Sequence, residues 1–156
     1  RVTHNDTKLN NVMIDDLTGK GICVIDLDTV MPGLVMNDFG DSIRTGASTA
    51  EEDEINLSLV SCSMELFETY TRGFLKGCGN SLTPLEVSLL PMGAKMMTYE
   101  NGIRFLTDYL QGDVYFKIAR ENHNLDRCRT QKKKDEDIEA KWDQMQEIVQ
   151  KVSAEV

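Results

Sequence analysis

The stretch His4-Asn5-Asp6-Thr7-Lys8-Leu9-Asn10-Asn11 has the pattern H-x-D-x-x-x-x-N, and the apolar stretch Val24-Ile25-Asp26 follows shortly after it. Between the two, Asp16-Leu17-Thr18-Gly19-Lys20-Gly21 has the Asp and Gly residues of a hairpin turn. We therefore expect two antiparallel strands, with Asn11 where the first strand begins and Asp26 where the second ends. Because a hairpin returns the chain to its starting end, Asn11 and Asp26 are expected to lie close together.

The side chains of Asp6, Asn11 and Asp26 are the set of polar groups that phosphoryl transfer from a nucleotide to a hydroxyl requires. One carboxylate must lie beside the attacking hydroxyl, and an aspartate is ionised for this role at neutral pH. An amide oxygen and a second carboxylate can hold Mg²⁺ against the phosphates, because Mg²⁺ prefers oxygen ligands and takes one or two of them from carboxylates. Asp6 is the candidate for the first role, and Asn11 and Asp26 are the candidates for the second.

The overall composition sets limits on the partners. The 156 residues include 17 basic and 26 acidic side chains, a formal charge of −9, and are enough for one compact domain. A net negative charge argues against a nucleic-acid or anionic-membrane surface. The apolar runs are too short for a membrane span, and no basic-then-apolar leader opens the chain. We expect a cytoplasmic protein with no nucleic-acid or membrane partner.

Cysteine and histidine are sparse and scattered. The four cysteines lack C-x-x-C spacing, and the chain has only two histidines, so structural zinc is not expected. A chain of this size with this aliphatic content does not need a disulfide framework, so we expect reduced thiols.

Apolar residues at helical spacing predict helices over most of the remaining chain. The first helix is expected to begin with Asp38 as its N-cap, the second to span about residues 64–76, and the third to begin at Thr83-Pro84. In the third we expect a bend or a close approach at Gly102 and an apolar stripe that packs in the core. The stripe consists of Leu85, Leu89, Met92, Met96, Ile103, Leu106 and Leu110.

Charged runs interrupt these patterns at two places. Glu51-Glu52-Asp53-Glu54 is expected to be a solvated loop, and Lys132-Lys133-Lys134 followed by Asp135-Glu136-Asp137 a solvated start to a closing helix. That helix has Trp142 and Val149 in its apolar rhythm. The resulting fold class is mainly α (α+β), with a small catalytic β-hairpin.

The chain resembles the C-terminal lobe of the aminoglycoside phosphotransferase-like kinases, a small-molecule branch of the protein-kinase-like fold. The first motif alone is typical of the wider kinase-like group. The stretches from Val24 to Gly33, Asp38-Phe39-Gly40-Asp41 and Arg104 to Leu110 are most similar to N-acetylhexosamine 1-kinases. The resemblance implies that residues 1–156 form the catalytic and acceptor-binding lobe. The N-terminal nucleotide lobe of the same parent chain would then lie outside this sequence, and the isolated chain is expected to be inactive.

The resemblance also implies a reaction and roles for individual residues. ATP would donate the phosphate, Mg²⁺ would be the cofactor, and the acceptor would be a small-molecule hydroxyl, namely the anomeric hydroxyl of an N-acetylhexosamine. Asp6 becomes the catalytic base or orienting carboxylate, and Asn11 and Asp26 the Mg²⁺ ligands. Arg104 and Tyr115 become acceptor contacts, since a guanidinium fork and a phenol suit sugar hydroxyls and an acetamido carbonyl.

Four further residues near the motif have more than one interpretation. Lys8 either approaches the transferring phosphate or is an exposed loop lysine, and Asp28 either supports the metal site or caps a turn. His4 is expected to be structural. Asp38-Phe39-Gly40 has the letters of a kinase metal motif, but it follows the strand end too late, so we expect Asp38 to cap a helix and to accept hydrogen bonds from the catalytic-loop backbone.

Three other functions compete with the sugar-kinase interpretation. An aminoglycoside or choline-type acceptor would keep the same mechanism. Asp26-Leu27-Asp28-Thr29 also fits the D-x-D-x-T signature of haloacid-dehalogenase-like phosphatases, in which the first aspartate is a nucleophile. That family needs further parallel strands, whereas the residues after Met64 are predicted to be helical. A non-catalytic kinase-like binding module is disfavoured because Asp6, Asn11 and Asp26 are all present.

Overall fold

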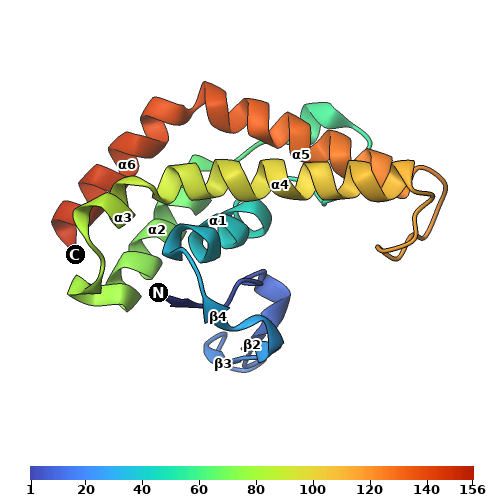
Figure 1. Cartoon of the computed structure of the whole chain (residues 1–156). Coiled ribbons are helices and arrows are strands. Elements are labelled where there is room, and N and C mark those ends of the chain that lie inside the picture. The colour runs from blue at the N-terminus through green and yellow to red at the C-terminus, as the bar shows by residue number, and fades with distance from the viewer.

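The computed structural model describes all residues, 1–156, and is mainly helical, which confirms the predicted fold class. Figure 1 shows helix α4 crossing the molecule beside α5, with a small β region on the other side of α1. No helix is both long and apolar enough to cross a bilayer. The helices are α1 (Val35–Gly46), α2 (Met64–Cys78), α3 (Pro84–Ser88), α4 (Leu90–Leu110), α5 (His123–Ala140) and α6 (Trp142–Glu155).

The β region contains two separate antiparallel pairs. Strand β2 (Val12–Ile14) pairs with β3 (Gly21–Val24), as the hairpin chemistry predicts, and β1 (Val2–Thr3) pairs with β4 (Met31–Pro32). The hairpin turn is closed by the carboxylate of Asp15, which accepts hydrogen bonds from the backbone N–H and the hydroxyl of Thr18, both at 2.7 Å. The second pair brings the first residues of the chain against the segment that leads into α1.

The first helix begins earlier than the sequence suggests. Leu34 is the N-cap of α1, so Asp38 lies within the first helical turn, and the prediction that Asp38 is the cap was wrong. Gly40 explains how closely α1 packs against α4, because a Cβ at Gly40 would lie 2.1 Å from the carbonyl oxygen of Gly93. A Cβ at Gly93 would in turn lie 2.0 Å from the carbonyl oxygen of Met36. The two backbones are therefore in direct contact.

The buried face of α4 is not the apolar stripe that the sequence predicts. Leu85 and Leu110 are 67% and 73% exposed, so the prediction of core packing for this stripe was wrong. Small and polar residues face the neighbouring helices instead, because only short side chains fit where the backbones approach this closely. They are Gly93, Ala94, Thr98, Asn101, Gly102 and Asp108; Leu90, Pro91 and Phe105 are the larger apolar residues that α4 buries beside them. The close approach predicted at Gly102 is confirmed, since a Cβ there would lie 3.2 Å from Cβ of Gln131.

Helix boundaries differ from the prediction in two further places. The helix after Thr83 is divided at Leu89 into α3 and α4, although the predicted start is confirmed by a capping box between Thr83 and Glu86. Helix α5 begins earlier than the predicted closing helix, at His123 instead of about Lys132, and ends at Ala140, before α6. It contains Lys134, which is only 2% exposed, so the prediction of a solvated start for the closing helix was wrong.

The apolar core lies between α1, α2 and α6. The Phe39 ring is fully buried and packs edge-on against the rings of Phe67 and Phe74, with centroids 5.8 and 5.2 Å away. Met145 and Val152 of α6 close the other side of the cluster. This core holds α1 in place, and α1 carries the residues that hold the H-x-D loop.

Candidate active site

Helix α1 holds the H-x-D loop through polar contacts. The carboxylate of Asp38 accepts hydrogen bonds from the backbone N–H groups of His4 (2.8 Å) and Asn5 (2.7 Å). The hydroxyl of Thr7 donates a hydrogen bond to the carbonyl oxygen of Asp38. The hydroxyl of Ser42 donates a hydrogen bond to the carbonyl oxygen of Thr7 at 2.8 Å. Asn5 has a φ of 64°, a left-handed conformation that Asn tolerates better than most residues. The loop is thus fixed by one helical turn of α1.

The ring of His4 connects the loop to the strand end. Its Nε2 lies 3.1 Å from the carbonyl oxygen of Ile25, and the backbone N–H of Asp6 donates to its Nδ1 at 3.3 Å. These partners place the ring hydrogen on Nε2. Both ring nitrogens are therefore engaged with backbone groups.

Asp6 lies between a cation and an amide. Its Oδ2 accepts hydrogen bonds from Nζ of Lys8 at 2.7 Å and from Nδ2 of Asn11 at 2.8 Å. Partial burial raises the pKa of Asp6, but these hydrogen bonds and the charge of Lys8 outweigh it and hold the pKa below its ordinary value. The carboxylate is ionised at neutral pH, as a hydrogen-bond acceptor for a hydroxyl must be.

The hairpin brings Asn11 and Asp26 together. Asn11 belongs to a short 3-10 helix (Leu9–Asn11) before β2, and its carbonyl oxygen accepts a hydrogen bond from the N–H of Ile25 at 2.9 Å. Asp26 follows β3 with a φ of 62°. The neighbouring carboxylate of Asp28 raises the pKa of Asp26, first by a shared hydrogen bond and then by charge repulsion.

These groups fit a divalent cation. Asp26 and Asp28 are two carboxylates that repel each other, and the side-chain oxygen of Asn11 accepts no hydrogen bond while its Nδ2 donates to Asp6. The donors are all oxygens, which is the set that Mg²⁺ prefers. No cluster of three or more His, Cys, Asp or Glu side chains with metal-binding geometry is formed, so the protein would supply only part of the coordination shell.

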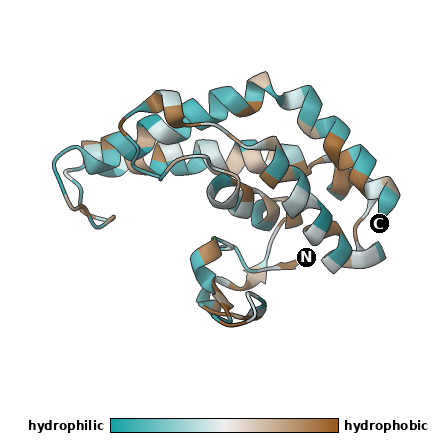
Figure 2. Cartoon of the chain, turned by 180° about the vertical axis from the view of Figure 1, so that it is seen from behind, coloured by the Kyte–Doolittle hydropathy of each residue, from teal (hydrophilic) through white to brown (hydrophobic).

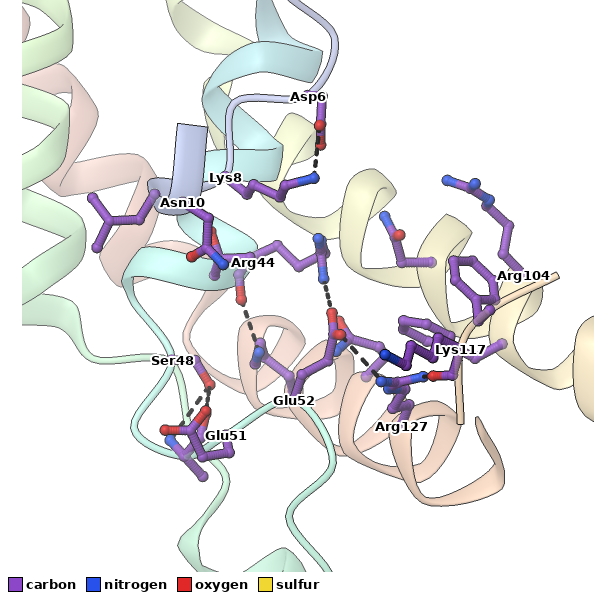
Figure 3. A pocket seen from close by; sticks show the side chains of 18 of the residues that line it. Asp6, Lys8, Asn10, Arg44, Ser48, Glu51, Glu52, Arg104, Lys117 and Arg127 are labelled. Carbon is purple, nitrogen blue, oxygen red and sulfur yellow. Dashed lines mark hydrogen bonds and ion pairs between the residues drawn. The ribbon is translucent and has the colours of Figure 1, made fainter. Parts of the chain in front are cut away.

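A cavity of about 800 Å³ opens beside Asp6. Its wall is formed by the H-x-D loop, the end of α1, the segment from Ser48 to Glu52, and the facing sides of α4 and α5 with the loop between them (Figure 3). The predicted residues Asp6, Lys8, Arg104 and Tyr115 all line it. The structure therefore brings together two groups that lie about 100 residues apart in the sequence.

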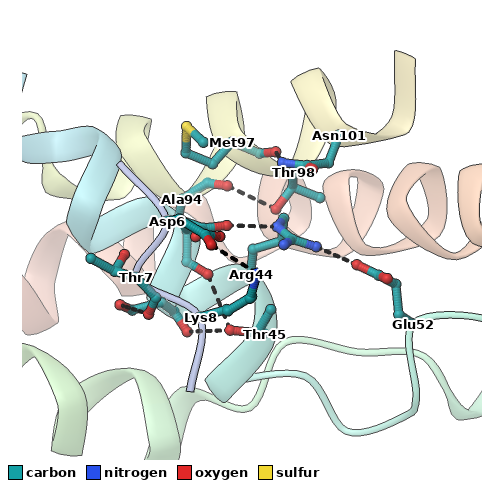
Figure 4. A network of polar contacts seen from close by, with 12 residues as sticks. Asp6, Thr7, Lys8, Arg44, Thr45, Glu52, Ala94, Met97, Thr98 and Asn101 are labelled. Carbon is teal, nitrogen blue, oxygen red and sulfur yellow. Dashed lines mark hydrogen bonds and ion pairs between the residues drawn. The ribbon is translucent and has the colours of Figure 1, made fainter. Parts of the chain in front are cut away.

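An ion-pair network that the sequence analysis missed forms the floor of this cavity. Arg44, which is 7% exposed, contacts Asp41 at 3.0 Å. It also contacts Glu52 at 2.6 Å (Figure 4). Nζ of Lys134 donates to the carbonyl oxygen of Arg44 at 2.8 Å, and burial lowers the pKa of this lysine to about 8. The prediction of a fully solvated loop at Glu51–Glu54 was therefore wrong for Glu52. The acidic composition of this loop did not reveal that Glu52 pairs with Arg44 of the preceding helix α1.

The acceptor-side residues are held by a buried carboxylate. Asp108 of α4 accepts hydrogen bonds from the backbone N–H groups of Val114, Tyr115 and Phe116, at 2.8 to 2.9 Å. Burial raises the pKa of Asp108, but these N–H groups outweigh it and lower the pKa overall. The guanidinium of Arg104 lies over the rings of Tyr115 (5.9 Å) and Phe116 (5.4 Å). Tyr115 is 74% exposed, so it is not a core residue.

Gln131 is another lining residue that the sequence did not single out. Its side chain is 1% exposed, and neither its amide nitrogen nor its amide oxygen has a hydrogen-bond partner. Buried polar atoms are satisfied in the large majority of cases, so an unpaired amide in a cavity wall indicates a place for a ligand or water. No local sequence signal distinguishes this glutamine.

The fold and the site define a class: a mainly helical lobe of the kinase-like fold, carrying an H-x-D-x-x-x-x-N loop and a β-hairpin at its edge. Residues 1–61 match the model of the phosphotransferase enzyme family, APH. The match agrees with the resemblance of the first part of the chain to aminoglycoside phosphotransferase-like kinases. It covers the H-x-D loop, the hairpin, all of α1 and the segment that contributes Glu52.

The phosphatase interpretation fails on the fold. A haloacid-dehalogenase-like site needs its D-x-D segment at the end of a strand in a parallel sheet. Strand β3 instead pairs antiparallel with β2 alone, and the chain after Gly33 forms six α-helices. Asp26 is therefore not positioned as the nucleophile of such an enzyme.

Proposed function

We propose that this chain forms the catalytic and acceptor-binding lobe of a kinase that transfers the γ-phosphoryl group of ATP to a hydroxyl of a small molecule, most specifically the anomeric hydroxyl of an N-acetylhexosamine. The observation that carries the proposal is the position of Asp6. Its ionised carboxylate lies at the wall of the cavity and is held by Lys8 and Asn11. A hydroxyl in the cavity would donate a hydrogen bond to this carboxylate and so be oriented for in-line attack.

Asn11 and Asp26, with Asp28 beside them, would hold Mg²⁺ at the end of the hairpin. The ion would neutralise charge on the donor phosphates. The mutual repulsion of Asp26 and Asp28 supports this role, because a cation between two carboxylates removes the cost of bringing them together. His4 and Asp38 would position the loop through the backbone contacts described above.

Lys8 has two possible partners in this scheme. It pairs with Asp6 at 2.7 Å, and Asp26 also acts on it electrostatically. When nucleotide binds, its ammonium would lie close enough to the hairpin end to contact a transferred phosphoryl oxygen. Release of Asp6 by Lys8 would then leave one carboxylate oxygen for the acceptor hydroxyl.

The acetamido group of the proposed acceptor has a natural partner in the cavity. An acetamido group offers one N–H and one carbonyl oxygen, and the unpaired side chain of Gln131 offers the complementary carbonyl oxygen and NH₂. Arg104 and Tyr115 would contact the sugar hydroxyls and one face of the ring. These features support an N-acetylhexosamine over choline, which has no amide and a single hydroxyl.

We propose further that a nucleotide-binding lobe of the same parent chain covers the β region. The strands and their connections contain many hydrophobic residues, which are brown in Figure 2. Several of them are exposed, including Ile22 (61% exposed) and Leu27 (60%). Apolar surface of this extent is typical of an interface. Phosphate-gripping groups for ATP would come from that lobe, so the assay should use the full-length protein.

The test is ADP release by the full-length protein with N-acetylglucosamine, N-acetylgalactosamine, an aminoglycoside and choline in parallel, with and without Mg²⁺. We expect Mg²⁺-dependent turnover with the acetylated sugars, formation of the 1-phosphate, and loss of turnover in Asp6→Asn. Turnover confined to an aminoglycoside or choline would keep the mechanism and refute the sugar. No turnover with any acceptor would refute the proposed function.

A further inference from the structure

The cavity beside Asp6 is positively charged although the chain is strongly acidic. Its lining includes six basic side chains and only three acidic ones, in a chain with a formal charge of −9. Two of the three acidic groups are already paired, Asp6 with Lys8 and Glu52 with Arg44. The excess positive charge therefore belongs to the other basic residues of the wall.

Two arginines of the wall lie over one pair of aromatic rings, and a lysine lies beside them. The rings of Phe105 and Phe116 lie 4.7 Å apart, with Arg104 over Phe116 at 5.4 Å and Arg127 over Phe105 at 5.5 Å. Arg127 also donates to the carbonyl oxygen of Lys117 at 3.2 Å. Figure 3 shows Lys117 beside Arg127, with Arg104 nearby, on the side of the cavity opposite Ser48.

The charged groups of this cluster lack close carboxylate partners. Arg104 contacts only aromatic rings, and the ammonium of Lys117 has neither a hydrogen bond nor an ion pair. Arg127 approaches a carboxylate only at 3.9 Å, in Glu52, which is engaged more closely by Arg44. Like-charged side chains gathered around a cavity without counter-charges create a potential that favours an anionic ligand.

We infer that Arg104, Lys117 and Arg127 form a subsite for an anionic group of the acceptor, a carboxylate or a phosphate, with Phe105 and Phe116 as the apolar floor. The inference rests on the proposed function, since it concerns the acceptor of the same site. The buried, unpaired amide of Gln131 is a second and independent sign that the cavity wall receives a polar ligand. The expected acceptor is then an N-acetylhexosamine with a negatively charged substituent. Polycationic aminoglycosides would be repelled.

A charge series on one sugar tests this without requiring catalysis. N-acetylglucosamine, its 6-phosphate, its 6-carboxylate and its 6-ammonium derivative keep the ring and the acetamido group and differ only in the charge at one position. Binding to the full-length protein is measured by calorimetry without nucleotide, at low and high salt. We expect an anionic member to bind at least about tenfold tighter than the neutral sugar, as one or more charge-assisted hydrogen bonds imply, and to weaken as salt increases.

Variants locate the effect and separate it from folding. Lys117→Gln should reduce the preference for the anionic sugar over the neutral sugar several-fold; Lys117 is exposed, so the fold should persist. Lys132→Gln is the charge-matched control, because Lys132 lies on the outer face of α5 and does not line the cavity. A phosphate preference and a carboxylate preference are distinguished by which derivative binds tighter.

The outcomes for the two proposals are distinct. Equal affinity for neutral and anionic sugars, tightest binding of the ammonium derivative, or an equal effect of Lys117→Gln and Lys132→Gln would overturn the anionic subsite. A charge preference without any phosphoryl transfer would leave the subsite standing and refute the kinase function. Phosphoryl transfer to the sugars without a charge preference in binding would support the kinase function and refute the anionic subsite.

Discussion

The N-terminal segment, residues 1–34, and the helical body, residues 35–156, are held by different kinds of interaction. In the former only Thr3 and Asn11 are buried, and large apolar side chains such as Leu9 and Leu17 are exposed. In the latter a cluster of 13 buried residues forms one hydrophobic core. The segment that carries Asp6 is attached to that core through hydrogen bonds to α1. Its position therefore depends on a few polar contacts, whereas the helical body depends on packing.

Asp6→Asn should have the largest effect on activity and almost none on stability. The amide is neutral and a poorer acceptor for the hydroxyl proton, so we expect turnover by the full-length protein to fall by about 10²- to 10⁴-fold. Asp6 and Lys8 form a partly exposed pair, worth roughly 1 kcal/mol or less to folding. Turnover assays and thermal unfolding measure the two effects. A variant that retained activity would remove Asp6 from the mechanism.

Phe39→Ala should have the largest effect on the helical body. The ring is fully buried among Phe67, Tyr70 and Phe74, so its removal should lower the free energy of unfolding by about 3–5 kcal/mol. Leu110→Ala is the matched control, because Leu110 belongs to the stripe that the sequence assigns to the core but is 73% exposed. Its effect should be within about 0.5 kcal/mol. Similar losses in denaturant unfolding of both variants would contradict the observed packing of α4.

Asp38→Asn should disturb the connection between the two regions. An amide can accept from only one of the N–H groups of His4 and Asn5 while its NH₂ faces the other, which costs roughly 1–3 kcal/mol. Hydrogen exchange should become faster at these two amides and remain slow in the helices. Asp143→Asn, also in the first turn of a helix but exposed, is the control. Loss of Mg²⁺ binding with both amides still protected would instead assign Asp38 to the metal.

The two regions also differ in how far the sequence predicts them. The hairpin and the proximity of Asn11 and Asp26 follow from turn residues within a short stretch, so local chemistry is sufficient. The buried face of α4 cannot be predicted in this way, because helical periodicity does not tell which side of the helix a neighbouring helix covers. Gly93 shows the reason: backbone contact with α1 selects residues for smallness. The hydrogen bond from Lys134 of α5 to the carbonyl oxygen of Arg44 and the unpaired amide of Gln131 depend on contacts between distant elements, which one sequence does not encode locally.

Asp26→Asn should give only a small change in stability, and it should be stabilising. Asp28 raises the folded-state pKa of Asp26, so the ionised pair opposes folding. Stability should therefore fall as the pH rises through the window just above the ordinary aspartate pKa of about 4. In EDTA the variant should therefore unfold at a slightly higher temperature than wild type at pH 7, and the difference should vanish below about pH 4. Asp15→Asn on the same hairpin should lower the unfolding temperature at pH 7, because hydrogen bonds from Thr18 lower the pKa of Asp15.

Mg²⁺ should stabilise wild type but not Asp26→Asn, even though that variant is the more stable one in EDTA. A lower unfolding temperature for Asp26→Asn at pH 7 in EDTA would mean that the carboxylate of Asp26 stabilises the hairpin. It would contradict the view that this carboxylate lowers the stability of the fold and is present to bind a cation.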